Sequence, residues 1–193
     1  MANISIGYPN GYKEVRPSEI VNGVKIPKMA ARPSHQNTAA NMWRIFREHF
    51  KGGSCRVYMD TFVFLEDDEK YIPDVAVVCD PSKIDPNKGI FGAPDLVAEV
   101  LSASTKKRDK GHKKEIYEKH GVKEYWLVDV AGQAVEVYLL HEGSYYLSNV
   151  YELDFPEHEL EDMSEEDRAM VSQTFKTSLF DDLIIDVRDI FED

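Results

Sequence analysis

Two carboxylates and one lysine stand out as residues that could do chemistry together. Asp74 follows Pro73 at the start of an apolar stretch, Glu99 lies inside the apolar run 95–102, and Lys113 lies on the basic segment that follows. A carboxylate within a hydrophobic strand is unfavourable unless a partner, a proton or a metal ion compensates it. Two carboxylates and a lysine can hold a divalent cation against a phosphate group and activate water. The fold must therefore bring these three side chains together.

Strand geometry decides which acids can share a metal ion. Asp95 and Glu99 lie on one face of a strand but are four residues apart, roughly 13 Å, too far to chelate one ion together. Asp95 is therefore expected to start the strand or to support the site from outside. Asp74 begins the preceding strand, and pairing of the two strands would place its carboxylate beside that of Glu99. Carboxylate oxygens suit Mg²⁺ or Mn²⁺, and the backbone carbonyl of Val100 is expected as a further ligand.

Lys113 shares one stripe of a predicted helix with two other polar residues. Asp109 lies four residues before it and Tyr117 four residues after it. From a helix packed on the sheet, the lysine tip could enter a site built on the strand and orient water or stabilise a charged phosphate. Asp109, in the first helical turn, is favoured by the helix dipole or positions Lys113.

Each of these residues also has a purely structural interpretation. Asp74 can simply start a strand after a proline, and Lys113 can be a solvated surface lysine. Glu99 is harder to explain in this way, because a carboxylate between valines demands compensation. His35 before the first helix is expected to be a capping residue rather than a ligand, and Gln36 is equally unspecific. The joint occurrence of the three groups favours function.

The hydrophobic pattern predicts a mixed α/β sheet with helices on both faces, in a single domain over 1–193 whose core spans about 19–191. The turn Asn22-Gly23 suits a tight hairpin, and Ser34 suits the N-cap of a helix that Gly52-Gly53 ends. The predicted elements are a hairpin over 19–26, a helix over 35–51, antiparallel strands over 56–66 and 71–79, a loop over 80–94, a central strand over 95–102, a helix from Ser104 or Thr105 to His120, a strand over 124–130, a hairpin over 134–140 and 144–153, and a strand or short helix over 179–191.

Composition places the chain among ordinary globular proteins. Its 193 residues are 42% hydrophobic, and no run approaches the ~18 apolar residues of a membrane helix. The first residues lack the basic and apolar blocks of a secretory signal. Cys55 and Cys79 have no metal-ligand spacing, so we expect reduced, buried thiols in a cytoplasmic protein.

The charge distribution neither favours nor excludes a nucleic-acid partner. The net charge is −12, but the segment 152–168 holds nine acidic residues and one basic residue, a net of −8, so the remainder carries about −4. The segment 106–119 holds seven basic and three acidic residues, a net of +4. The acidic segment is typical of a solvated loop that could screen the basic face. The basic residues expected to contact a nucleic-acid backbone are Lys106, Lys107, Arg108, Lys110 and Lys114.

At these residues the chain resembles the Uma-two family of restriction endonucleases, within the PD-(D/E)XK nuclease superfamily. The stretches that carry the resemblance run from about Glu19 to Phe191: Ser34-His35-Gln36, Pro73-Asp-Val-Ala-Val-Val78, Ala93-Pro-Asp-Leu-Val-Ala-Glu-Val-Leu-Ser102, Ser104-Thr105, Asp109-x-x-x-Lys113-x-x-x-Tyr117, Gly121-Val-x-Glu-Tyr-Trp-Leu-Val-Asp129 and Ser178-Leu-Phe-x-x-Leu-x-Ile-Asp-Val187.

The resemblance implies a restriction-endonuclease-like fold, a central mixed β-sheet flanked by helices. Asp74 matches the metal-binding aspartate of the superfamily and Glu99 its second acid. Leu101 stands where the superfamily motif has lysine. In this family the lysine is found on the following helix, which indicates Lys113, with Lys114 or Lys110 as alternatives.

Two functions follow as hypotheses. The first is an endonuclease that uses Mg²⁺ or Mn²⁺ to hydrolyse DNA, with the basic end of the helix at the phosphate backbone. The second is a non-catalytic nucleic-acid-binding or scaffolding protein that keeps the nuclease fold, as a homodimer; the missing strand lysine and the net charge favour it. RNA or branched DNA as the substrate stays open, because phosphate contacts carry no sequence information. We expect no membrane partner.

Overall fold

A six-stranded mixed sheet forms the centre of the molecule. The computed structural model describes residues 16–153, 163–164 and 173–192, so most of the acidic segment 152–168 lies outside the described residues. In the central sheet β9 and β10 are parallel and the other pairs are antiparallel. In spatial order its strands are β12 (Ser144–Glu152), β11 (Ala134–His141), β10 (Glu124–Asp129), β9 (Leu96–Val100), β6 (Val75–Val78) and β3 (Arg56–Met59).

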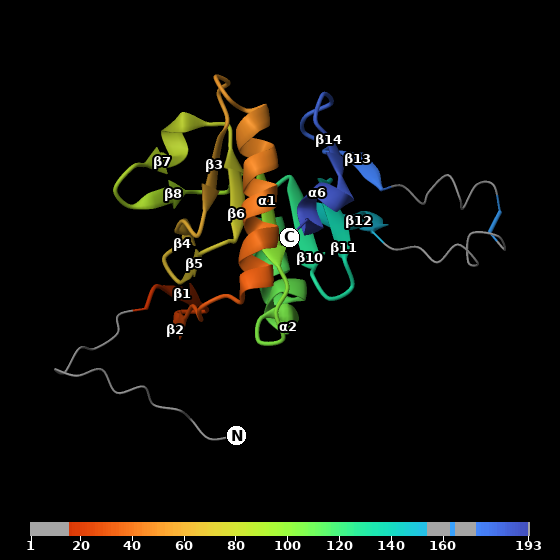
Figure 1. The fold of residues 1–193 in the computed structure, drawn as a ribbon. Coiled ribbons are helices and arrows are strands. Elements are labelled where there is room, and N and C mark those ends of the chain that lie inside the picture. The colour runs from red at the N-terminus through yellow and green to blue at the C-terminus, as the bar shows by residue number, and fades with distance from the viewer. Residues whose placement is uncertain (1–15, 154–162, 165–172, 193) are drawn as a thin grey trace.

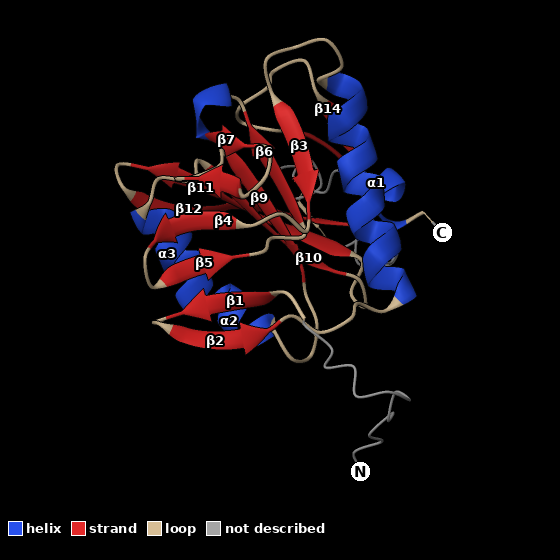
Figure 2. Cartoon of the chain, turned by 90° about the vertical axis from the view of Figure 1, so that its left-hand side faces the viewer, coloured by secondary structure: helices blue, strands red, loops and turns tan. Residues whose placement is uncertain are grey.

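A second sheet covers part of one face of the central sheet. Val63 and Ile90 of this sheet form a buried cluster with Ala76 and Val78 of β6. Figure 2 shows these strands on the side of the central sheet away from α1. Their spatial order is β2 (Val24–Pro27), β1 (Ser18–Val21), β5 (Glu69–Tyr71), β4 (Val63–Glu66), β8 (Gly89–Phe91) and β7 (Ile84–Asp85).

The second sheet corrects three sequence predictions. The strand predicted over 56–66 is two strands, β3 and β4, that belong to different sheets, because the chain turns at Asp60, whose φ is 49°. The strand predicted over 71–79 is divided in the same way between β5 and β6. The loop predicted over 80–94 contains β7, β8 and the short 3-10 helix η1 (Pro81–Lys83). The hairpin at Asn22-Gly23 is confirmed, with φ of 49° and 73°.

Helices cover both faces of the central sheet, as expected. The long helix α1 (Pro33–His49) buries Met42 and Phe46 against one face (Figure 1). The helices α2 (Lys106–Lys110) and α3 (His112–Lys119) pack on the other face, where Tyr117 lies among the buried aromatic residues. The C-terminal part adds β13 (Thr174–Lys176), β14 (Ile184–Asp186) and α6 (Val187–Phe191), and α6 contacts α1.

Helix ends differ from the sequence prediction in detail. Arg32, not Ser34, is the N-cap of α1, and Ser34 lies inside the first turn. The single helix predicted from Ser104 or Thr105 to His120 is broken at Gly111, where φ is −113° and ψ is −112°. Gly121, with φ of 81°, follows the end of the second part, as predicted. No helix of the described residues is long and apolar enough to cross a lipid bilayer.

The two cysteines also differ from the prediction of free thiols. Arg56 of β3 pairs with Val78 of β6, so Cys55 and Cys79 lie at adjacent positions of the two neighbouring strands. The structure joins them by a disulfide bond. The prediction was wrong because the absence of metal-ligand spacing says nothing about which side chains two paired strands place opposite each other.

Candidate functional site

Strand pairing places Asp74 opposite Glu99. In the antiparallel pair of β6 and β9, Val75 lies opposite Ala98. Continuing this register by one residue brings Asp74 opposite Glu99, and side-chain alternation puts both carboxylates on the same face. Their exposed fractions are 6% for Asp74 and 3% for Glu99. The two acids singled out in the sequence are therefore brought together, both nearly inaccessible to bulk water.

The Lys113 ammonium group contacts the Glu99 carboxyl group in the buried interior. Its Nζ lies 2.7 Å from Glu99 Oε1, and only 2% of the side chain is exposed. Asp109 Oδ1 is 3.9 Å from the same Nζ. The Tyr117 hydroxyl donates to Glu99 Oε1 at 3.3 Å. The predicted stripe of Asp109, Lys113 and Tyr117 thus meets the strand carboxylate despite the break at Gly111.

Glu19 is a member of this cluster that sequence reasoning did not identify. It lies on β1, is 3% exposed, and its Oε1 lies 3.1 Å from Lys113 Nζ. The same carboxylate accepts a hydrogen bond from the Ile72 amide at 3.1 Å and pairs with Arg108 at 2.7 Å. In the sequence Glu19 was only the first residue of a hairpin strand, and nothing local distinguishes it from a solvated glutamate.

Asp74 has its own set of cationic partners, which the sequence also did not reveal. Its Oδ1 lies 2.9 Å from Lys28 Nζ, and its Oδ2 lies 3.2 Å from His35 Nε2. The Val100 amide donates to Oδ2 at 2.8 Å. His35, which we expected to cap the first helix, lies inside the first turn of α1 and pairs with this acid instead.

The surroundings of Glu99 and Asp74 shift their pKa values in opposite directions. Burial, reinforced by the charges of Asp74, Asp109 and Glu19, raises the pKa of Glu99 to about 8, although Lys113 opposes the shift. Burial alone would also raise the pKa of Asp74, but the His35 hydrogen bond and the Lys28 charge outweigh it and lower that pKa well below its ordinary value. At neutral pH the metal-free site therefore holds an ionised Asp74 beside a Glu99 that retains its proton.

The pKa values of His35 and Lys113 are shifted in the direction that favours their cationic forms. Burial disfavours the charged His35 ring, but the hydrogen bond and charge of Asp74 raise its pKa, and a backbone hydrogen bond to Val100 contributes. Burial likewise opposes the charge on Lys113, but Glu99, Glu19 and Asp109 raise its pKa well above the ordinary value. Both shifts favour the cationic forms of the two side chains.

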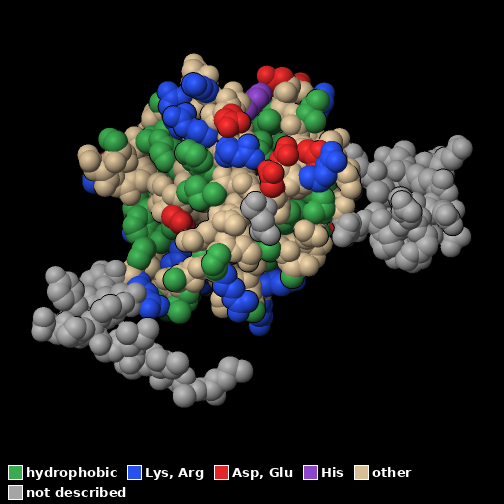
Figure 3. Space-filling view, viewed as in Figure 1, with side chains coloured by type: hydrophobic (Ala, Val, Ile, Leu, Met, Phe, Trp, Pro, Cys, Tyr) green, Lys and Arg blue, Asp and Glu red, His purple; other side chains and the backbone are tan. Residues whose placement is uncertain are grey.

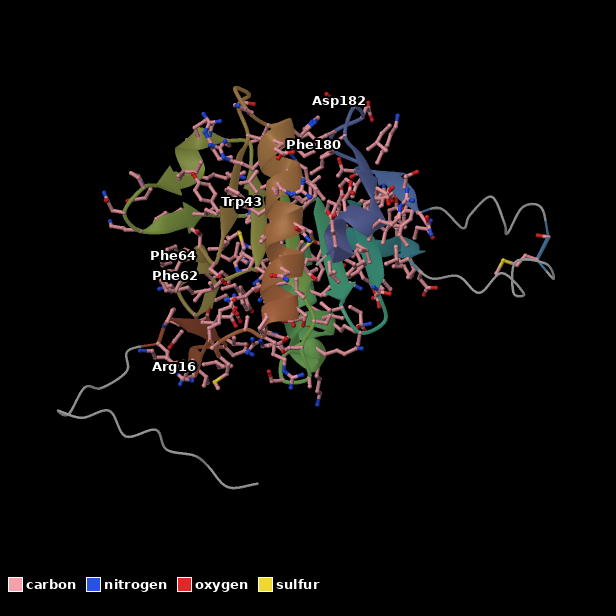
Figure 4. The ribbon with its side chains drawn as sticks, in the orientation of Figure 1. Arg16, Trp43, Phe62, Phe64, Phe180 and Asp182 are labelled. Atoms are coloured by element: carbon pink, nitrogen blue, oxygen red, sulfur yellow. A yellow bond between two sulfur atoms is a disulfide. The ribbon has the colours of Figure 1, made fainter. Side chains whose placement is uncertain are left out.

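A cavity of about 490 Å³ opens onto the Asp74 side of the cluster. Its lining includes Lys28, His35, Gln36, Asp60 and Asp74, and it also includes Arg16, which Figure 4 labels at the start of the described chain. Glu99 and Lys113 are absent from this lining. Of the two strand acids, Asp74 alone lines this cavity.

The donor set suits a hard divalent cation. Within the part of the chain that the structure describes, no group of three or more His, Cys, Asp and Glu side chains is placed to hold a metal ion by itself. Asp74 and Glu99 supply two carboxylates, and water or phosphate oxygens would complete the coordination, as is usual for Mg²⁺. Burial and, to a smaller extent, neighbouring negative charges raise the pKa of Glu99, and a bound cation would favour its ionised form. The residues present therefore fit Mg²⁺ or Mn²⁺.

Several predicted supporting residues have partners of their own. Asp95 accepts from Lys123 Nζ at 2.7 Å and from the Cys79 amide at 2.8 Å. Lys106 pairs with Asp129 at 2.9 Å and Lys110 with Glu136 at 2.5 Å. Three basic residues of the predicted nucleic-acid surface remain. Arg108 pairs with Glu19, and Lys107 is exposed. Lys114 Nζ lies 3.7 Å from the centre of the Tyr138 ring.

These pairs reduce the positive charge that the sequence count gave to the segment 106–119. The segment nevertheless begins with α2, which lies at the same end of the molecule as the β1–β2 hairpin and the start of α1 (Figure 1). The space-filling view shows lysine and arginine side chains at this lower end of the visible face (Figure 3). The exposed lysines of α2 are thus near the end of the molecule where the cavity lies.

A comparison with protein families identifies the family to which the chain belongs. The family model described as "Putative restriction endonuclease" (Uma2) matches residues 13–170, most of the chain. The chain belongs to the Uma2 family, which confirms the resemblance seen in the motifs around Asp74, Glu99 and Lys113.

Two individual proteins resemble this chain. The "Uncharacterized protein slr1290" of Synechocystis sp. is 31% identical over 112 residues, which span 57% of this chain and 58% of that protein. A crystal structure described as "a putative nuclease belonging to DUF820" from Anabaena variabilis has a TM-score of 0.66 and 22% identity, and the match covers 90% of this chain and 89% of that one. The second likeness shows that the two proteins share a fold.

Proposed function

We propose that this protein is a nuclease that hydrolyses phosphodiester bonds of DNA with the help of Mg²⁺ or Mn²⁺. The observation that carries the proposal is the convergence of Asp74 and Glu99 from two neighbouring strands beside a cavity. Asp74, Glu99 and the carbonyl of Val100 would hold the ion. When bound, the ion would polarise the scissile phosphate and lower the pKa of a water molecule.

Asp74, Glu99 and Lys113 would have distinct roles at this site. Asp74 stays ionised at neutral pH, so it presents a charged ligand at the cavity without first losing a proton. Glu99 must release its proton when the ion binds. Lys113, shielded from the cavity, holds the Glu99 carboxylate in place and keeps a positive charge behind it. Lys114 and Lys110, the alternatives to Lys113, have other partners on the strand β11.

His35 and Lys28 face the cavity and supply positive charge where a phosphate would approach. The His35 ring contacts Asp74 Oδ2 from the first turn of α1. The exposed Lys106 and Lys107 on α2 would contact the DNA backbone at a distance from the reacting phosphate. Such contacts add affinity and salt dependence without sequence preference.

A cleavage assay with matched variants tests the proposal. Purified protein is incubated with plasmid DNA, single-stranded DNA and RNA in Mg²⁺, in Mn²⁺ and in chelator. We expect cleavage only with metal, loss of at least about a hundredfold in Asp74→Asn and in Glu99→Gln, and near wild-type cleavage in Asp95→Asn, whose side chain pairs with Lys123. Absence of cleavage of every substrate, or equal cleavage by Asp74→Asn, would refute the proposal.

A non-catalytic nucleic-acid-binding protein is the second candidate. The observation in its favour is that Asp74 and Glu99 already have cationic partners within the chain, as acids do in purely structural networks. This candidate predicts DNA binding that is independent of divalent metal, together with no Mn²⁺ binding in calorimetry. The same purified protein therefore distinguishes the two functions.

A further inference from the structure

The ammonium group of Lys28 lies in a cage of three oxygen atoms. Its Nζ is 2.6 Å from Asp60 Oδ1, 2.9 Å from Asp74 Oδ1 and 2.9 Å from the carbonyl oxygen of Ile72. These oxygens come from the turn after β3 and from the segment between β5 and β6. A lysine ammonium has three hydrogen-bond donors, so the cage satisfies the whole group.

The same cage has the composition of a site for a hard cation. Two carboxylates and a backbone carbonyl converge on one point, which is the ligand chemistry of Mg²⁺, Mn²⁺ and Ca²⁺. The Asp74 oxygen that contacts Lys28 Nζ therefore belongs to an acid of the proposed metal site.

A divalent ion and this ammonium would compete for the same carboxylate oxygen. An ion bound at Asp74 would lie only a few ångströms from Lys28 Nζ, and two positive charges at that separation repel strongly in a partly buried site. The Lys28 side chain is 24% exposed and lines the cavity of about 490 Å³, so it has room to move away. Asp60 is 65% exposed and would remain beside the ion.

We propose that Lys28 is a tethered cation that fills the divalent-ion position at Asp74 and is displaced when the ion binds, with Asp60 then becoming an additional ligand. This inference rests on the proposed metal-dependent function. It goes beyond that function by naming a residue that weakens metal binding and an acid outside the family motif that strengthens it. Displacement would also free the ammonium group for a phosphate in the cavity.

Titration calorimetry with Mn²⁺ tests the inference on the full chain without any nucleic acid. Lys28→Met should bind Mn²⁺ about tenfold more tightly than wild type or better, since a competing charge is removed. Lys28→Arg, which keeps the charge, should show no gain. Lys123→Met, which removes a lysine paired with Asp95 outside the cavity, should match wild type. Adding Asp60→Asn to Lys28→Met should reverse much of the gain.

Thermal unfolding of each metal-free variant shows whether it is folded, and Lys28→Gln replaces Lys28→Met if the apolar side chain prevents folding. Equal or weaker Mn²⁺ binding by Lys28→Met and Lys28→Gln than by wild type, in a protein whose binding depends on Asp74, overturns the inference and leaves the proposed function intact. Absence of Mn²⁺ binding in wild type and in the Lys28 variants overturns both.

Discussion

Replacing Glu99 with glutamine should stabilise the metal-free protein. In the folded state burial raises the pKa of Glu99 from 4.5 to about 8, so at pH 7 the folded protein keeps a proton that the unfolded chain releases. Above pH 4.5 this difference stabilises the unfolded state relative to the folded state by about 1.4 kcal/mol for each further pH unit, up to the pKa of the folded state. At pH 7 the penalty on folding is roughly 3 kcal/mol, which glutamine, having no proton to lose, does not incur.

The sign of the pH dependence follows from the direction of this shift. The contribution of Glu99 to stability is fully present below pH 4.5 and is lost as the pH rises toward about 8. The stability advantage of Glu99→Gln over wild type should therefore be under about 1 kcal/mol at pH 5 and roughly 3 kcal/mol at pH 7. Urea unfolding of both proteins in chelator at the two pH values measures it.

Asp95→Asn is the matched control, because Asp95 precedes the same strand but has the opposite shift. Burial would raise the pKa of Asp95, but Lys123 and the Cys79 amide lower it. Its contribution is present above the ordinary pKa and is lost as the pH falls, so Asp95→Asn should be less stable than wild type at pH 7. An advantage of Glu99→Gln that does not change between pH 5 and pH 7, or a less stable Glu99→Gln at pH 7, would refute the reasoning.

Three further outcomes are expected. Lys113→Met should lower the free energy of unfolding by on the order of 3–5 kcal/mol, because it removes the buried cation that contacts Glu19 and Glu99. Lys114→Met, which loses a contact with the Tyr138 ring, should lower it by about 1 kcal/mol or less in the same urea titration. The double change Lys106→Ala and Lys107→Ala should weaken DNA binding to the same extent for all DNA sequences and reduce the salt dependence of binding, as measured by fluorescence anisotropy. An unchanged salt dependence would show that α2 does not contact the DNA backbone. Under denaturing, non-reducing conditions thiol titration should detect no free cysteine, and reduction should lower stability by about 2–4 kcal/mol; two free thiols per chain would contradict the disulfide.

Much of the fold could be predicted because the relevant signals are local. Every residue of β9 is buried, as its continuous apolar run predicted. The stripe of Asp109, Lys113 and Tyr117 reached the strand because helical spacing fixes which side chains share a face. Two of the boundaries that failed lie at Asp60 and Gly111, where single residues redirect the chain. A turn of one residue inside an otherwise regular pattern leaves little trace in hydrophobic periodicity.

The partners of the candidate site could not be predicted in this way. Glu19 meets Lys113 across 94 residues of sequence, and Lys28 meets Asp74 across 46. Glu19 lies on β1 of the second sheet, and Lys28 directly follows β2 of the same sheet. The sequence indicated these two strands only as an isolated hairpin. The roles of Glu19 and Lys28 depend on how that hairpin packs on the central sheet, and packing between distant segments has no local signature.

The sequence by itself determined that a carboxylate would be buried at position 99, since an apolar strand leaves its side chain no route to water, and that Asp74 and Lys113 would lie on the elements beside it. Only the tertiary structure decided which charges surround that carboxylate. Coulomb interactions depend on distances in space, so the raised pKa of Glu99 and the ion pairs of Asp74 with Lys28 and His35 exist only once the strands, the hairpin and the helices have packed together.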